Sequence, residues 1–77
     1  MQDDPEQTLD LSGLLCPLPV LKAGKRLRSM QAGETLRIMA TDPMAEIDLP
    51  HYCREQGHDM LGLTRSGDTF IFRIRRT

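Results

Sequence analysis

One of the two cysteines in this sequence stands where sulfur chemistry could run at neutral pH. Cys16 directly precedes Pro17, and Pro19 follows two residues later. Proline lacks a backbone N–H and has a φ near the helical value, so a first helical turn accommodates it. The pattern predicts Pro17 at the first helical position and Cys16 at the N-cap, where free N–H groups and the helix dipole stabilise a thiolate. Because the thiolate is the reactive form, Cys16 is the candidate catalytic residue.

The plain alternative for Cys16 is that it only caps the helix. Serine, threonine, aspartate and asparagine cap better by about 1 kcal/mol, so a cysteine there favours a chemical role. The other cysteine, Cys53, is expected on the inward face of a later helix, as an ordinary buried residue. A disulfide between the two would need Cα atoms within about 7 Å, which leaves a redox pair open as an alternative.

Other site chemistries find little support in the sequence. A metal site could be assembled from Cys16, His51, Cys53 and His58, but a His-x-Cys spacing is not a usual zinc pairing. A Cys-His hydrolase would need a third residue that orients the histidine and an oxyanion motif, and the sequence shows neither. No glycine-rich phosphate loop is present either. We therefore expect neither a metal nor a cofactor.

Length and composition indicate one small domain. The chain has 77 residues, 39% of them hydrophobic and 27% charged, with a net charge of −1. This charge gives no overall attraction to nucleic acid or to an anionic membrane, so we expect neither as a direct partner. No signal-peptide pattern or membrane-spanning run appears, and two cysteines are too few for a disulfide framework, which together predict a cytoplasmic protein. Residues 1–7 are expected to be a disordered tail, and residues 8–77 a single domain.

Periodicity predicts the order β-α-β-α-β-β. The expected strands cover residues 8–12, 34–41, 58–65 and 69–76, and the expected helices run from Pro17 to Ala32 and from Leu49 to Gln56. The first helix lies between two strands in a βαβ unit, which predicts parallel strands with Cys16 at the carboxyl end of the first. Only two amphipathic helices are available to cover the sheet. This indicates an α+β fold, a two-layer α/β sandwich in which the second face of the sheet is largely open.

The first helix is predicted to be amphipathic. Val20, Gly24, Leu27 and Gln31 fall in the buried sector at 100° per residue. The outer face carries Lys22, Lys25 and Arg26, together with Leu18, an apolar residue two positions from the cysteine.

Several short motifs together resemble the TusA-like (SirA-like) sulfur carrier family. They are Leu9-Asp10, Gly13-Leu14-x-Cys16-Pro17-x-Pro19-Val20, Gly33-Glu34-x-Leu36, Ala40-Thr41-Asp42-Pro43, Asp48-x-Pro50, Cys53 and Gly57-His58. The resemblance implies a mixed four-stranded sheet with two helices on one face. It also implies a sulfurtransferase-type carrier that turns over only with partner proteins. Its cysteine takes persulfide sulfur from a donor such as a cysteine desulfurase and relays it to an acceptor protein, in tRNA 2-thiolation or another sulfur-trafficking pathway.

The sequence departs from this family at two positions. The tRNA-thiolation carriers usually have glutamate inside Cys-Pro-x-Pro, where this chain has Leu18, and a basic residue is common where Leu15 stands. We hypothesise that Leu18, with Lys22, Lys25 and Arg26, contacts the sulfur donor or acceptor. Two alternatives to a carrier stay open, a regulatory protein-binding module and a thiol-disulfide redox protein using Cys16 and Cys53.

Overall fold

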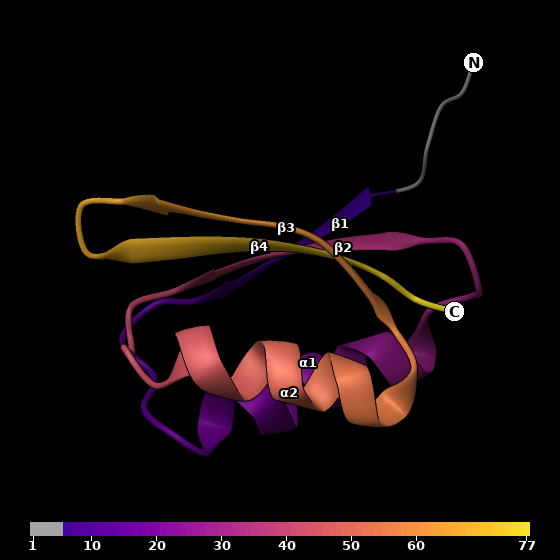
Figure 1. Ribbon diagram of the computed structural model, residues 1–77, viewed down its shortest axis with the longest axis horizontal. Coiled ribbons are helices and arrows are strands. Elements are labelled where there is room, and N and C mark those ends of the chain that lie inside the picture. Colours follow the sequence, from indigo (N-terminus) through magenta and orange to yellow (C-terminus); the bar gives the residue numbers. More distant parts are fainter. Residues whose placement is uncertain (1–5) are drawn as a thin grey trace.

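The computed structural model describes residues 6–77, which form two helices packed on one four-stranded sheet (Figure 1). The order confirms the predicted β-α-β-α-β-β succession: β1 (Glu6–Leu11), α1 (Leu18–Ser29), β2 (Thr35–Ala40), α2 (Ala45–Gln56), β3 (Asp59–Ser66) and β4 (Thr69–Arg75).

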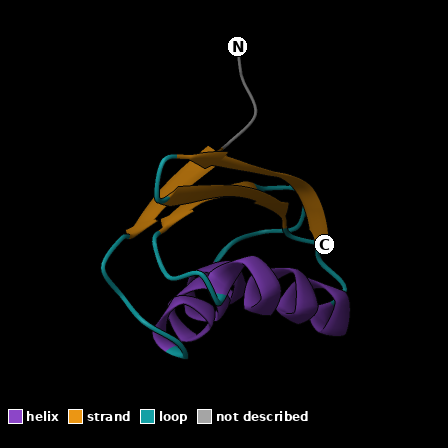
Figure 2. Ribbon diagram, turned by 60° about the vertical axis from the view of Figure 1, so that its left-hand side comes forward, coloured by secondary structure: helices purple, strands orange, loops and turns teal. Residues whose placement is uncertain are grey.

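The sheet is mixed and has the strand order β1-β2-β4-β3. β1 pairs with β2 in parallel, as the βαβ prediction requires, and the other two pairings are antiparallel. Both helices cover the same face of the sheet (Figure 2). The predicted two-layer α/β sandwich is therefore confirmed, and the carboxyl ends of β1 and β2 lie at one sheet edge.

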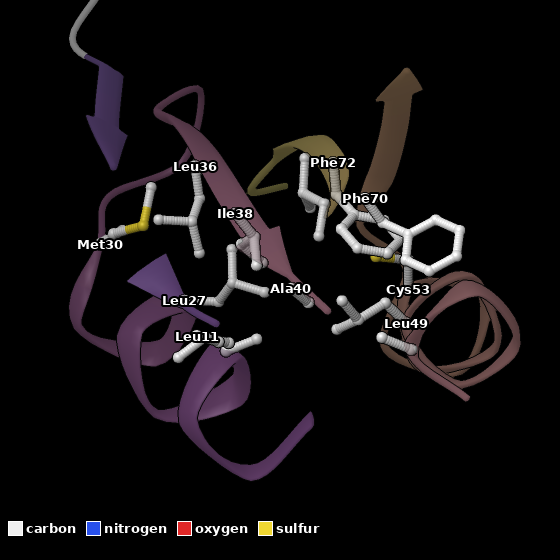
Figure 3. Packing of buried hydrophobic residues seen from close by; sticks show 13 residues of the cluster. Leu11, Leu27, Met30, Leu36, Ile38, Ala40, Leu49, Cys53, Phe70 and Phe72 are labelled. Carbon is white, nitrogen blue, oxygen red and sulfur yellow. The ribbon is translucent and has the colours of Figure 1, made fainter. Parts of the chain in front are cut away.

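Every second side chain of β2 and β4 points towards the helices and contributes to the hydrophobic core. Leu36, Ile38 and Ala40 of β2 lie opposite Ile74, Phe72 and Phe70 of β4, and all six are buried, as alternation predicts (Figure 3). The helices contribute the rest of the core, with Ala23 and Leu27 from α1 and Leu49 and Cys53 from α2.

The bounds of β1 and α1 differ from the prediction. Glu6 and Gln7, expected in the tail, pair with β2, and an ion pair of 3.2 Å joins Glu6 to Arg73; the rest of the expected tail, residues 1–5, lies outside the described residues. α1 ends at Ser29 because Met30 turns to an extended conformation that buries its side chain. Gln31, predicted in the buried stripe, is consequently exposed beyond the helix.

The second helix begins four residues earlier than predicted. Asp42-Pro43, and not Asp48-Leu49-Pro50, precedes the start, so Pro50 lies inside α2. The backbone carbonyl of Asp42 accepts the N–H of Ala45 at 2.9 Å, and the Ala45 side chain is buried in the core. Pro50 has no backbone N–H, so α2 lacks one helical hydrogen bond at this residue.

Candidate functional site

Cys16 lies in the connection between β1 and α1, beside the connection between β2 and α2. Figure 1 shows both connections at the same end of the molecule, where the two parallel strands finish. The Cys16 side chain is exposed, whereas Cys53 is buried. The predicted position of Cys16 at the carboxyl end of β1 is therefore confirmed.

The local geometry differs from the predicted helix cap. α1 begins at Leu18 with Pro17 as its N-cap, so Pro17 is not the first helical residue and Cys16 precedes the cap. The Cys16–Pro17 peptide bond is cis. A turn closes before the helix, since the N–H of Leu18 donates to the carbonyl of Leu15 at 2.8 Å. Pro19, the second helical residue, is buried.

A buried carboxylate holds the Cys16 backbone in place. The N–H of Cys16 donates to Oδ2 of Asp42 at 2.6 Å, and the N–H of Met44 donates to Oδ1 at 3.1 Å. Asp42 is only 6% exposed. One side chain thus ties the loop that carries the cysteine to the first turn of α2. Beside it, the N–H of Gly13 donates to Oγ1 of Thr41 at 2.8 Å, which joins the same two loops a second time.

A second carboxylate contacts the sulfur itself. The Cys16 thiol donates to Oδ2 of Asp48, with 3.2 Å between Sγ and the oxygen. This hydrogen bond raises the pKa of Cys16 above its ordinary value of 9.0, and partial desolvation and the negative charges of Asp48 and Asp42 raise it further. The expectation that the helix terminus stabilises a thiolate is therefore wrong for the protein alone. Two carboxylates favour the protonated form of the sulfur, Asp48 through its hydrogen bond and its charge, and Asp42 through its charge.

Of the predicted partner contacts on α1, Leu18, Lys22 and Lys25 are exposed, whereas Arg26 is half-buried and donates to Oε1 of Gln7 at 3.1 Å. Leu18 is 42% exposed, as expected, and two further apolar side chains, Leu15 and Leu21, are exposed at 67% and 58%. The basic residues line a separate groove of about 280 Å³, formed by Leu9, Lys22, Lys25, Arg26 and Ser29. Leu18 is not among the residues that line this groove, so the apolar and basic groups form neighbouring surfaces along α1 and do not share one pocket.

Cys53 is placed as a core residue. Its side chain is 1% exposed, and burial raises the pKa of its thiol to about 11. A protonated, buried thiol is a poor nucleophile, and both cysteines are free. Across residues 6–77, no group of three His, Cys, Asp or Glu side chains is arranged to hold a metal ion. No helix in that range is long and apolar enough to cross a membrane.

Sequence reasoning did not find the contacts that Asp42 and Asp48 make with Cys16. Both aspartates precede a proline or a Leu-Pro pair, a pattern that is typical of a helix start. Asp48 also lines a groove of about 240 Å³ between the helices, with Pro17, Val20, His51, Tyr52 and Glu55. Because this groove includes the residue after Cys16 and the residue that contacts its sulfur, it adjoins the reactive atom.

Comparison with known proteins identifies the family. The family model described as "Sulfurtransferase TusA" matches residues 7–76. The sulfur carrier protein TusA of Pseudomonas entomophila is 39% identical over 71 residues, which cover 92% of this chain and 89% of that protein. The protein of the same name from Pseudomonas putida strain GB-1 is 38% identical over 72 residues, or 94% and 90% of the two chains.

A solved structure agrees in fold. The crystal structure of a SirA-like protein from Desulfitobacterium hafniense superposes with a TM-score of 0.79 and 21% identity, and the match covers 88% of this chain and 93% of that one. The family match over nearly the whole chain, the relatives' identity and this shared fold agree with one another. The chain belongs to the TusA family of sulfurtransferases, whose members compared above are named sulfur carrier proteins.

Proposed function

We propose that Cys16 is the residue on which this sulfur carrier accepts sulfur and from which it passes the sulfur on. One observation carries the assignment to this residue. Cys16 is the exposed cysteine, at the edge where two parallel strands end, and its backbone is fixed by a buried carboxylate. Cys53, enclosed in the core, offers no access to a partner protein.

The transfer is an exchange between sulfur atoms without net oxidation. The deprotonated Cys16 sulfur attacks the outer sulfur of a donor persulfide, a new S–S bond forms, and the donor's S–S bond breaks. The electron pair of the broken bond leaves on the donor's inner sulfur, which takes the proton that Cys16 gave up. In sum, R–S–S⁻ and Cys16–SH become R–SH and Cys16–S–S⁻. Attack by an acceptor thiol on the outer sulfur reverses these roles and empties the carrier.

A cysteine desulfurase supplied with cysteine is the donor we propose, and it provides the direct test. After incubation without reductant, intact-mass and peptide analysis should find one added sulfur on Cys16 in the wild type and in Cys53→Ser. Cys16→Ser should gain none while keeping its circular dichroism spectrum. Sulfur on Cys53, or no uptake from several desulfurases, would contradict the assignment. Cys16→Ser also separates a carrier from a protein-binding module, since a binding module would keep its activity.

We further propose that Leu18 and the basic residues Lys22, Lys25 and Arg26 contact the donor or acceptor. An apolar side chain that is exposed beside a reactive residue is typical of a docking surface, and the neighbouring cations add electrostatic steering. Leu18→Glu should slow sulfur uptake from the desulfurase. Leu61→Glu is the matched control, because Leu61 is 44% exposed and lies on β3. Equal uptake rates in the two variants would remove Leu18 from the contact surface.

A further inference from the structure

Loading the carrier takes away the proton that joins Cys16 to Asp48. In the empty protein the thiol donates to Oδ2 of Asp48 at 3.2 Å. In the exchange described above, that proton leaves with the donor thiol and a negative charge arrives on the outer sulfur. A persulfide is more acidic than a thiol, so this outer sulfur is anionic at neutral pH and donates no hydrogen bond. Loading therefore replaces an attraction to Asp48 by a repulsion between two anions.

We propose that the Asp48 carboxylate biases the carrier towards discharge, by holding the empty thiol through a hydrogen bond and by repelling the anionic outer sulfur of the loaded form. This inference rests on the proposed function of Cys16. Asp48 is a catalytic residue in this sense, because its oxygen contacts the reacting sulfur. The carboxylate does not select the acceptor protein. It lowers the affinity of Cys16 for the transferred sulfur, and this shifts the equilibrium towards transfer to an acceptor thiol.

The surroundings of Cys16 support the inference. The two charged groups that affect this thiol are both carboxylates, Asp48 at the sulfur and Asp42 at the backbone N–H. Both raise the pKa of Cys16, because a negative charge nearby disfavours the charged form of the sulfur. Because Cys16 is exposed, an outer sulfur repelled from Asp48 can turn into solvent, where an acceptor can reach it.

The test compares loading equilibria in variants that change only the charge at Asp48. Asp48→Asn keeps the size of the side chain and an oxygen that accepts a hydrogen bond but removes the charge, whereas Asp48→Glu retains a charge. Glu46→Gln is the matched control, since Glu46 lies in the same first turn of α2, is exposed, and has the same relation to the helix dipole. Each protein is equilibrated with glutathione persulfide and glutathione at one fixed ratio, and the loaded fraction of Cys16 is read by intact mass.

The expected result is a loading constant about 1.5- to 5-fold larger for Asp48→Asn than for the wild type, the range for an interaction of exposed charged groups. Glu46→Gln should match the wild type, and Asp48→Glu should lie between the wild type and Asp48→Asn. Equal constants for Asp48→Asn and the wild type would overturn the inference while leaving Cys16 as the carrier residue. If Cys16 takes no sulfur in any protein, the proposed function itself fails.

A second readout does not depend on sulfur transfer. The rate of Cys16 alkylation by iodoacetamide, measured against pH, reports the fraction of thiolate. Asp48→Asn should be alkylated faster than the wild type at pH 7, and its profile should lie at lower pH, while Glu46→Gln should follow the wild type. An unchanged profile in a folded Asp48→Asn protein would show that the carboxylate does not act on the sulfur, and would overturn the inference.

Discussion

Replacing Asp42 by alanine tests whether one buried carboxylate positions the reactive loop. Its two oxygens accept the N–H groups of Cys16 and Met44, at 2.6 and 3.1 Å, and the side chain is 6% exposed. Alanine removes both acceptors and leaves both donors without a partner in the protein. The change therefore acts on the loop before α1 and on the first turn of α2 together.

The magnitude follows from the number and kind of bonds lost. A hydrogen bond to a charged group contributes about 1.5–3 kcal/mol, but water will reach part of this site once the carboxylate is gone. Loss of a helix-capping side chain alone costs about 0.5–2 kcal/mol. We expect Asp42→Ala to lower the free energy of unfolding by about 2–4 kcal/mol. A domain of this size has roughly 4–12 kcal/mol in total, so the loss corresponds to a fall in Tm of roughly 10–30 °C.

Urea unfolding followed by circular dichroism measures this change. Asp42→Asn should be intermediate, because its single carbonyl oxygen can accept one of the two N–H groups while its amide faces the other. Asp68→Ala is the control, since Asp68 is exposed in the turn between β3 and β4. If Asp42→Ala lies within about 0.5 kcal/mol of Asp68→Ala, the carboxylate does not hold the loop as the distances indicate.

Three further predictions concern buried and partly buried groups elsewhere in the fold. Burial raises the pKa of Cys53 from 9.0 to about 11, so the folded protein holds this proton more tightly than the unfolded chain does. The urea midpoint should therefore fall as pH rises from 9 towards 11. Cys53→Ala should lose this pH dependence. Burial and the positive charge of Arg76 lower the pKa of His58 below 6.5, so the unfolded chain binds the proton more tightly. Stability should therefore fall as pH drops below 6.5, and His58→Gln should lessen this fall. A methyl group at Gly24 would lie 2.7 Å from Oη of Tyr52. Gly24→Ala should therefore cost more stability in the wild type than in a Tyr52→Leu background. A double-mutant cycle of urea unfolding measures this coupling.

The sheet and its core could be predicted because their determinants are local. Alternation along residues 36–40 and 70–74 assigns each side chain to a face, and every inward position identified there is buried in the structure. The exposure of Leu18 followed from helical angles in the same way. Period and spacing are properties of neighbouring residues, so a single sequence is sufficient to show them.

The helix starts could not be assigned by local pattern alone. Asp42-Pro43 and Asp48-Leu49-Pro50 are both reasonable beginnings for α2, six residues apart. The choice is made by tertiary contacts, because Ala45 packs into the core and the Asp42 carboxylate binds Cys16, 26 residues away in the sequence. The contact between Cys16 and Asp48 spans 32 residues and has no local signature. The residues of the site were therefore predictable one by one, but the interactions among them were not.

The raised pKa of the Cys16 thiol also affects the kinetics of sulfur exchange. The hydrogen bond from the thiol to Asp48, at 3.2 Å, is the main cause of the raised pKa of Cys16, so the carboxylate outweighs the helix terminus. A thiol of higher pKa is the more nucleophilic as a thiolate but leaves more slowly when attacked. Removing the Asp48 charge enlarges the thiolate fraction of Cys16 at neutral pH and should therefore speed loading, while shifting the equilibrium towards the loaded form. A variant that merely distorts the loop would slow loading, so the combination of faster and fuller loading identifies an electrostatic role for Asp48.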